Sequence, residues 1–304
     1  MLSEPMRYLH LDVFTDRRFE GNQLAVFPEP DGLSDDMMQT LTREMNFSEC
    51  TFIFPAEAGG DVRMRIFTPE SELPIAGHPT IGSTFALAGE GVIARGRTDF
   101  VYELGAGPTP VSLEWDDRGL EFVWMTQPLP AFGETIQDRA GLAAAAGIGE
   151  RDLADHPVQE VSCGVPYLLV PIATRAAVDS VSVERHALAR VQRDAGMQEL
   201  PVFLFTQERP ATAGEETIYS RMIAPGFGIA EDPATGSASG PLGCYMLRHG
   251  LVGPDMARSI LSLQGVAMRR PSRIYVSIES RTGDITRVRV GGRAVTVGRG
   301  EIFT

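Results

Sequence analysis

The sequence predicts an α+β protein made of two similar domains, and three observations support this. The chain has 304 residues, more than one domain usually holds, and 43% hydrophobic with 22% charged residues is ordinary for a folded protein. Strand-like runs alternate with a few helical segments. A strand, an irregular loop and a nearly all-apolar helix also occur in the same order in both halves, which favours a duplicated domain.

The first half begins with two strand-like runs, "RYLHLDVFT" and "GNQLAVFPEPDG", bounded by turn residues. The segment "LSDDMMQTLTREMNF" predicts an amphipathic surface helix, because Ser34 is a good N-cap and acidic residues follow in the first turn. Its apolar residues recur at helical spacing: Leu33, Met37, Met38, Leu41 and Met45. Two further strands are expected in "CTFIFPAE" and "DVRMRIFT".

The segment "PTIGSTFALAGEG" is apolar on nearly every face and predicts a buried helix wrapped by sheet. Pro79 suits the first helical position, and Gly89 is a plausible stop. Strands follow in "VYEL", "VSLEW" and "LEFVWM". In "TQPLPAFGET" the pattern breaks, so we expect one domain over residues 1–127 and a second over 128–304, with the last strands able to return to the first.

The second half repeats this plan. Helices are expected in "IQDRAGLAAAAGI", "VERHALARVQRDAG" and from about Ser237 to Gly250, and the strands "VQEVSCG", "PYLLVPI", "VFLFTQ" and "IYSRMIA" lie between them. Late strands follow in "RIYVSIE", "ITRVRVGG" and "AVTVGRGEIF". The run "RMRIFTP" followed by "AGHPTIGSTFALA" parallels "YSRMIAP" followed by "TGSASGPLGCYML".

Composition excludes several classes of function. A net charge of −13 argues against nucleic-acid binding and against anionic membranes, and no window is apolar enough for a membrane helix. The start, "MLSEPMRYLHLDVF", lacks the segments of a signal peptide, so we expect a cytoplasmic protein. Cys50, Cys163 and Cys244 are scattered, which favours reduced thiols over disulfides or zinc. No metal site and no nucleotide-binding motif emerges.

The two apolar helices have similar entrances, "ELPIAGHPTIG" at residues 72–82 and "EDPATGSASG" at 231–240. A helix N-terminus carries N–H groups without intrahelical partners and about +0.5 charge, and glycine allows a ligand close to the backbone. Two such entrances that face one cleft would bind a carboxylate or an enolate-like anion. The pattern therefore predicts a small anionic substrate.

Four separated motifs, "EGNQLAVF", "REMNFSECTFIF", "RIFTPESELPIAGHPTIG" and "EDPATGSASGPLGCY", resemble the phenazine-biosynthesis PhzF-like isomerases, which have the diaminopimelate epimerase fold. The resemblance implies two similar domains, each a bent antiparallel sheet around a central helix. It also implies a homodimer that needs no cofactor. The implied reaction is isomerisation of trans-2,3-dihydro-3-hydroxyanthranilate, or a similar cyclic or amino-carboxylate substrate, by proton transfer between carbons.

Carried over by position, the family's catalytic acid/base falls on Glu49, with His78 and Asp232 as its partners in catalysis. The resemblance assigns substrate binding to Gly77, Gly236, Ser237 and Asn22. One carboxylate can take a proton from carbon and return it if both carbons lie on the same face. Glu49, with an unperturbed pKa of about 4.3, would need partial desolvation for this, and its apolar neighbours make that plausible.

Each of these residues also has a structural interpretation when taken alone. Glu49 is then a solvated or capping carboxylate, His78 a helix-cap side chain and Asp232 an acid in a turn. Ser237 would be a helix N-cap, and Asn22 a turn residue.

Two other functions stay open at this stage. Related epimerases carry a cysteine before the glycine of each helix entrance, whereas this chain has Ala76 and Thr235, which counts against an amino acid epimerase or racemase. A small-molecule binding protein without turnover is the third possibility, and the joint presence of Glu49, His78 and Asp232 counts against it.

Overall fold

The computed structural model describes residues 5–208 and 215–304. The chain forms two compact units, the first running to Thr126 and taking in Gly291–Thr304, the second covering Gln127–Val290. The first four residues of the start "MLSEPMRYLHLDVF" lie outside the described residues.

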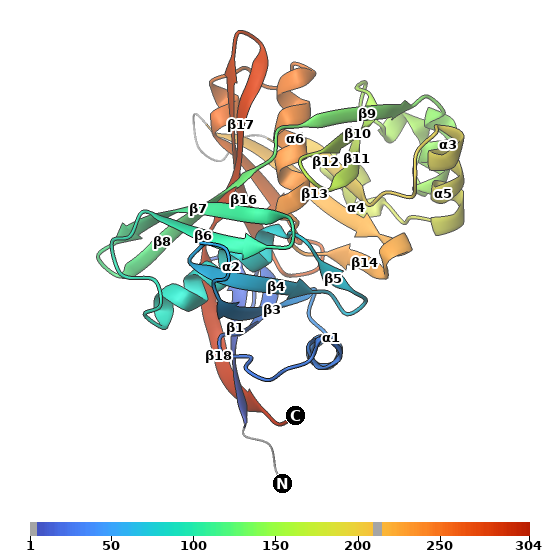
Figure 1. Cartoon of the computed structure of the whole chain (residues 1–304). Helices are drawn as coiled ribbons and strands as arrows, with labels where there is room; N and C mark the ends of the chain where they lie inside the picture. Colours follow the sequence, from blue (N-terminus) through green and yellow to red (C-terminus); the bar gives the residue numbers. More distant parts are fainter. Residues whose placement is uncertain (1–4, 209–214) are drawn as a thin grey trace. The chain divides into compact units, whose positions relative to one another are not determined.

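The first unit is a mixed sheet with two helices (Figure 1). Antiparallel pairs flank two parallel pairs, β2 with β3 and β4 with β6, and the strand order is β18, β1, β2, β3, β4, β6, β7, β8, with short β5 also beside β4. Its elements are β1 (Met6–Val13), β2 (Asn22–Phe27), α1 (Asp35–Met45), β3 (Glu49–Pro55), β4 (Val62–Phe67), β5 (Glu72–Leu73), α2 (Gly77–Gly89), β6 (Asp99–Leu104), β7 (Gly107–Asp116), β8 (Gly119–Gln127) and β18 (Ala294–Ile302).

The second unit repeats this pairing. Its strand order is β9, β10, β11, β12, β13, β15, β16, with β14 beside β13, and the parallel pairs are β11 with β12 and β13 with β15. Its elements are β9 (Ala131–Ile136), α3 (Arg139–Ala145), η1 (Glu150–Asp152), β10 (Val158–Ser162), β11 (Pro166–Pro171), α4 (Arg175–Ser180), α5 (Arg185–Asp194), β12 (Val202–Glu208), β13 (Glu216–Ala224), η2 (Pro225–Phe227), β14 (Ile229–Asp232), α6 (Gly236–Arg248), η3 (Met256–Arg258), β15 (Ile260–Gln264), β16 (Ser272–Arg281) and β17 (Asp284–Gly292).

The two units therefore share one topology. In each unit a short strand, β5 or β14, pairs with the strand before it, and the central helix follows directly. The α+β class and the internal repeat expected from the sequence are confirmed. The repeat also explains why two similar helix entrances occur in one chain.

Helix α1 begins as predicted, because the Ser34 side chain accepts a hydrogen bond from the backbone N–H of Met37. It packs against β3 and β4 on one face of the sheet (Figure 1). Phe27 and Phe52, stacked with ring centroids 4.8 Å apart, form the centre of this outer core with Met38 and Leu41.

Helix α2 contacts β1, β2, β3 and β18, and ten of its residues are buried, as the apolar sequence predicted. It begins at Gly77, so Pro79 is the third helical residue rather than the first. Proline is tolerated there because a first-turn N–H has no intrahelical acceptor. The helix ends at Gly89, as expected.

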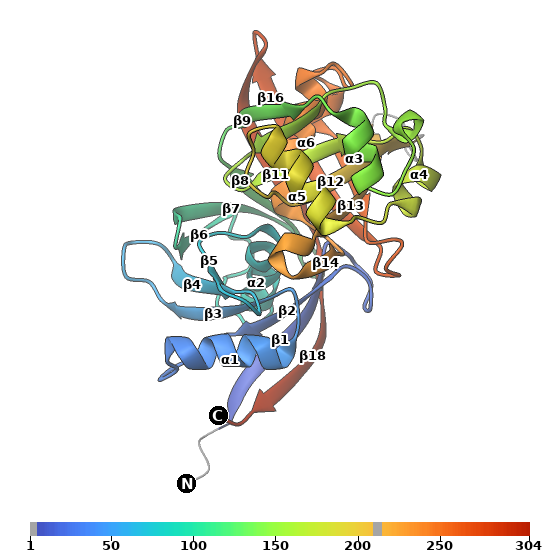
Figure 2. The ribbon, with the colours of Figure 1, turned by 90° about the vertical axis from the view of Figure 1, so that its right-hand side faces the viewer.

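Helix α6 occupies the equivalent place in the second unit, opposite α3 and α5, which Figure 2 shows side by side. The pleat of β12 divides its side chains between the two faces. Val202 and Leu204 enter the core shared with α3 and α5, whereas Phe205 contacts Tyr245 of α6 at 5.5 Å between ring centroids. The sheet is therefore covered on both faces.

The close approach of α2 to its sheet depends on Gly82. A Cβ atom at this position would lie 2.6 Å from both Leu24 Cδ2 and Val13 Cγ2. We expect Gly82→Val to lower the free energy of unfolding by about 1–3 kcal/mol through overpacking, as measured by urea denaturation. Gly89→Ala in the same helix is the matched control, because nothing lies within 4 Å of its added carbon, and it should be neutral or stabilising by up to ~1 kcal/mol. Equal stability of the Gly82→Val and wild-type proteins would contradict the close packing.

Candidate functional site

The pleat of β3 directs Glu49 toward the start of α2. Side chains at alternate positions share a face, and Thr51 bonds Ser83 of α2 at 2.9 Å between oxygens. Glu49, two residues earlier, lies on the same face, and its Oε2 is 3.3 Å from Nδ1 of His78. Cys50 points to the opposite face and joins the outer core with α1.

Glu49, His78 and Asn22 form one cluster in the first unit. Asn22 is the first residue of β2, and its Nδ2 is 3.4 Å from Nδ1 of His78. The His78 side chain is 4% exposed and that of Glu49 is 15% exposed, so the carboxylate is the more open of the two to solvent. The structure thus brings together three residues that span 56 positions of the sequence.

His78 is neutral in this setting. Burial lowers its pKa to about 3, and a hydrogen bond with the backbone of Gln23 offsets only part of that effect. Nδ1 of the ring thus lies near both the Glu49 carboxylate and the Asn22 amide, and the tautomer of His78 decides whether this nitrogen donates or accepts. His78 lies against the Glu49 carboxylate without adding a positive charge.

This pKa predicts a specific pH dependence of stability. Below its ordinary pKa of 6.5 the unfolded chain binds a proton at His78, but the folded chain does so only near pH 3. The stability that the neutral, buried His78 contributes to folding is therefore complete above pH 6.5. It is lost as the pH falls from 6.5 toward 3, at about 1.4 kcal/mol of unfolding free energy per pH unit. Urea unfolding of the wild type and of His78→Gln between about pH 7 and pH 5 measures the difference in slope. Parallel curves would contradict a buried neutral histidine.

Helix α2 begins at Gly77, and no capping side chain occupies the N–H groups of its first turn. The preceding residue, Ala76, has extended backbone and no side-chain cap hydrogen bond, and the first turn contains no acidic residue. The positive end of the helix dipole therefore lies beside His78 and Glu49 with no built-in counter-charge from its own first turn. An anion is the ligand that suits it.

In the second unit a ring of hydrogen bonds holds Asp232 at the start of α6. The Thr235 hydroxyl donates to Asp232 Oδ2 at 2.5 Å. Gln264 donates from Nε2 to Thr235 Oγ1 and to the Asp232 carbonyl, at 2.9 and 2.8 Å, and accepts from the Thr235 N–H at 2.9 Å. All three residues are buried, so the loop into α6 is fixed by polar contacts sheltered from water.

Gln264 was not anticipated from the sequence, because it closes the β-strand "ILSLQ", far from any motif. Gln264→Met keeps its length but leaves buried donors and acceptors unpaired, at about 1–3 kcal/mol each. We expect it to lower the free energy of unfolding by at least ~2 kcal/mol and to weaken turnover as well.

The matched control is Gln192→Met. Gln192 is equally buried and bonds the N–H and C=O of Leu200, at 2.8 and 3.1 Å, and neither of these bonds involves Asp232 or Thr235. It should lose comparable stability with unchanged kinetics in the folded fraction. Equal kinetic effects of the two variants would show that Gln264 has no specific role in the loop.

Gly236 and Ser237 begin α6. The N-cap position is Thr235, so the alternative role of Ser237 as the N-cap is wrong, and the Ser237 Oγ instead lies 2.7 Å from the Tyr167 hydroxyl of β11. Tyr167 is a second residue that the sequence did not identify. It sits in the apolar run "PYLLVPI", where a strand tyrosine gives no sign of its partner.

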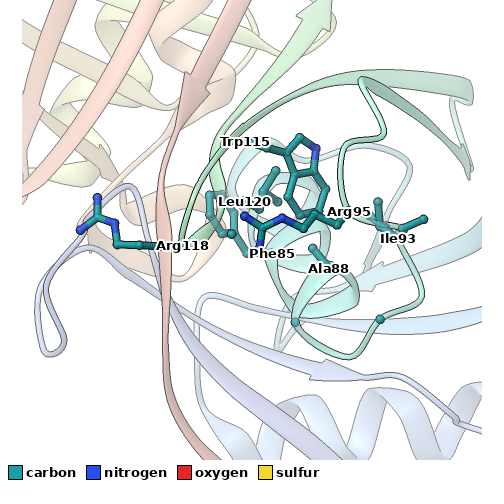
Figure 3. A pocket seen from close by; sticks show the side chains of 11 residues that line it. Phe85, Ala88, Ile93, Arg95, Trp115, Arg118 and Leu120 are labelled. Atoms are coloured by element: carbon teal, nitrogen blue, oxygen red, sulfur yellow. The ribbon is translucent and has the colours of Figure 1, made fainter.

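A separate hollow of about 510 Å³ lies in the first unit between the C-terminal end of α2 and the β7–β8 hairpin (Figure 3). It contains none of the predicted site residues. Its lining includes Phe85, Ile93, Arg95, Trp115, Arg118 and Leu120.

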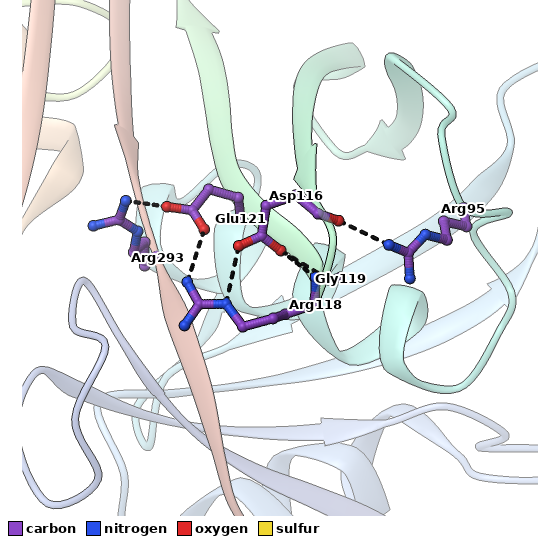
Figure 4. A network of polar contacts seen from close by, with 6 residues as sticks. All are labelled: Arg95, Asp116, Arg118, Gly119, Glu121 and Arg293. Carbon is purple, nitrogen blue, oxygen red and sulfur yellow. Dashed lines mark hydrogen bonds and ion pairs between the residues drawn. The ribbon is translucent and has the colours of Figure 1, made fainter.

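The two arginines that line this hollow, Arg95 and Arg118, both interact with neighbouring polar groups (Figure 4). Arg95 donates to the Asp116 carbonyl at 2.8 Å, and Arg118 pairs with the Asp116 carboxylate at 3.1 Å. The backbone N–H of Arg118 is the main cause that lowers the pKa of Asp116 to about 2. This network ties the hairpin together and contains no acid–base pair suited to proton transfer.

Within the part of the chain that the structure describes, no three His, Cys, Asp or Glu side chains gather as a possible metal site. Over the same residues, none of the helices combines the length and the apolar character needed to cross a membrane.

The comparisons with known proteins agree with these features. Residues 11–300 match the family model described as phenazine biosynthesis-like protein. The trans-2,3-dihydro-3-hydroxyanthranilate isomerase of Pseudomonas fluorescens is 35% identical over 296 residues, covering 97% of this chain and 98% of the relative.

Two solved structures extend the comparison. A predicted epimerase from Pseudomonas aeruginosa has a TM-score of 0.79 at 32% identity, with 98% of this chain and 99% of that chain covered. A PhzF-family phenazine biosynthesis protein from Bacillus anthracis has a TM-score of 0.87 at 24% identity, with 99% of both chains covered, and shows the same fold. The chain therefore belongs to the phenazine biosynthesis-like protein family, over nearly its whole length.

Proposed function

We propose that this chain is a cofactor-independent isomerase that moves a proton between two carbons of a small cyclic amino-carboxylate, of the trans-2,3-dihydro-3-hydroxyanthranilate type. The name of the Pseudomonas fluorescens relative, similar over nearly the full length of both chains, supports this substrate class. The observation that carries the proposal is the contact of 3.3 Å between the Glu49 carboxylate and the buried, neutral His78.

In this reaction the Glu49 carboxylate takes a proton from a ring carbon, and the electron pair left behind is delocalised over the substrate's π-system. The resulting carboxylic acid then returns the proton to a second carbon on the same face. His78, held by Asn22, keeps Glu49 in place and accepts or donates one hydrogen bond according to the charge on Glu49. The substrate loses one proton and gains one, so no redox partner is needed.

The remaining residues are assigned to binding. The N–H groups at the starts of α2 and α6, at Gly77, Gly236 and Ser237, suit the negative charge of the substrate. Asp232 suits a donor group of the substrate such as its amine. Its carboxylate is oriented by the Thr235 hydroxyl at 2.5 Å.

Amino acid racemisation is disfavoured by the groups at the two helix entrances. Ala76 has a methyl group where a thiol would be needed. The Thr235 hydroxyl already donates to Asp232 and accepts from Gln264, so it is not available as a base.

A cytoplasmic location and a homodimer belong to the same proposal, on the strength of the family resemblance. Light scattering coupled to size-exclusion chromatography tests the dimer, since the mass of a single chain is 33.0 kDa.

The deciding experiment incubates the purified chain with trans-2,3-dihydro-3-hydroxyanthranilate in deuterium oxide, and with a panel of amino acids in parallel. We expect isomerisation of the cyclic substrate, followed by ultraviolet absorbance and proton NMR, and no exchange at amino acid α-carbons. Exchange at α-carbons would favour a racemase. Saturable binding without turnover or exchange would favour a binding protein.

A further inference from the structure

Two cysteines of the second unit lie together. The Sγ atoms of Cys163 and Cys244 are 4.0 Å apart although 81 positions separate the residues in the chain. Cys163 lies in the turn between β10 and β11, and Cys244 lies on the buried face of α6. The scattered positions of the cysteines in the sequence gave no sign of this pair.

The backbone that carries the pair is fixed at two points along one face of α6. Helix α6 contacts both β10 and β11, and Tyr167 of β11 bonds Ser237 in the first turn of the helix at 2.7 Å. Cys244 comes about two helical turns after Ser237 and therefore lies on the same face. The thiols thus remain adjacent because two secondary-structure elements are packed, rather than through a chance side-chain rotamer.

We propose that Cys163 and Cys244 form an oxidation site, at which a hydroperoxide converts the two thiols into an intramolecular disulfide. The Cys163 thiol attacks the peroxide oxygen to give a sulfenic acid and one molecule of water or alcohol. The Cys244 thiol then displaces water from the sulfenic sulfur, and the S–S bond forms. Two thiols are oxidised and one peroxide is reduced, with both thiol protons leaving in the products.

Geometry and environment support this order of events. Formation of the disulfide shortens the distance between the two Sγ atoms from 4.0 Å to about 2.05 Å. This requires movement of two side chains that are already in contact. Cys163 is 5% exposed at a turn, whereas Cys244 is fully buried. The hydrogen bond with Cys163, together with burial, raises the pKa of Cys244. Cys163 is the more exposed of the two sulfurs and therefore meets the peroxide first, and Cys244 reacts in the second step.

Cys50 provides an internal control. It is fully buried in the first unit against α1, and burial raises its pKa to about 12. Its thiol should therefore stay reduced while the pair reacts.

The test treats the reduced, folded chain with hydrogen peroxide, quenches with catalase, denatures it and alkylates it with iodoacetamide. We expect the reduced protein to take up label at all three cysteines and the oxidised protein at Cys50 alone. The intact mass before alkylation should fall by two hydrogen atoms. A non-reducing tryptic digest should contain one peptide pair joined through Cys163 and Cys244. This readout does not depend on the substrate or on the proposed activity.

Cys163→Ser and Cys244→Ala, each checked for native circular dichroism, should both abolish the mass loss. In Cys244→Ala a dimedone adduct should appear on Cys163 instead. If either variant misfolds, the wild-type peptide map decides by itself. Three reactive thiols after peroxide treatment, a linkage that includes Cys50, or a covalent dimer in place of the internal bond would each overturn the proposal.

Discussion

Glu49→Gln should reduce turnover by about 10²–10⁴-fold, the range that a positioned acid–base group contributes. The substitution preserves the size of the side chain and its place beside His78, whose Nδ1 lies 3.3 Å from Glu49 Oε2. It removes the group that can take a proton from carbon. The measurement is kcat and KM on the cyclic substrate, with the free energy of unfolding determined alongside.

The control for this variant is Glu72→Gln. Glu72 pairs with Arg65 on the surface of the same unit, at 2.7 Å, and exposed pairs of this kind contribute about 0–1 kcal/mol. Its kinetics should match the wild type. A Glu49→Gln protein that retains wild-type kcat would exclude Glu49 as the proton-transfer group.

Asp232→Asn should lower kcat/KM by about 10²-fold, since a charge that orients or stabilises the reacting substrate is worth this much when lost. The Thr235 hydroxyl donates to the carboxylate at 2.5 Å, and this charge-assisted bond weakens when the acceptor becomes a neutral amide. We therefore also expect a modest loss of stability. Steady-state kinetics and urea denaturation separate the two effects.

Asp179→Asn is the matched control, because Asp179 also accepts a 2.5 Å hydrogen bond from a hydroxyl, that of Tyr219, in the same unit. It should lose similar stability and keep its kinetics. If Asp232→Asn and Asp179→Asn changed kcat/KM equally, Asp232 would have only a structural role.

Long, strongly patterned elements were predictable from the sequence. Helix α1 was expected from its cap and apolar spacing, and α2 and α6 from segments that are apolar on all sides. The internal repeat was visible because both central helices follow a strand and an irregular loop.

Short elements were missed, because too few residues show a period. Helix α4 has six residues, β14 has four and β15 has five, and each depends on packing rather than on its own sequence. Strand β9 falls in the proline-containing stretch, where the broken pattern indicates only a boundary.

The candidate site was also predictable only in part. Glu49, His78 and Asn22 could be selected by motif, but their mutual contacts depend on the pleat of β3 and on parallel pairing of β2 with β3. Gln264 and Tyr167 carry no local signal, since their importance comes from partners 29 and 70 positions away. Tertiary hydrogen bonds of this kind appear only once the chain is folded.

Deuterium incorporation is the most direct test that Glu49 transfers a proton between carbon atoms. In deuterium oxide the wild type should yield product that carries deuterium at the newly protonated carbon, or should retain the substrate's own hydrogen if the carboxyl group is shielded between the two steps. Substrate deuterated at the carbon that loses its proton distinguishes uptake from solvent from internal transfer. Neither uptake nor transfer should be detected in Glu49→Gln. Label transfer at an undiminished rate in Glu49→Gln would contradict the account.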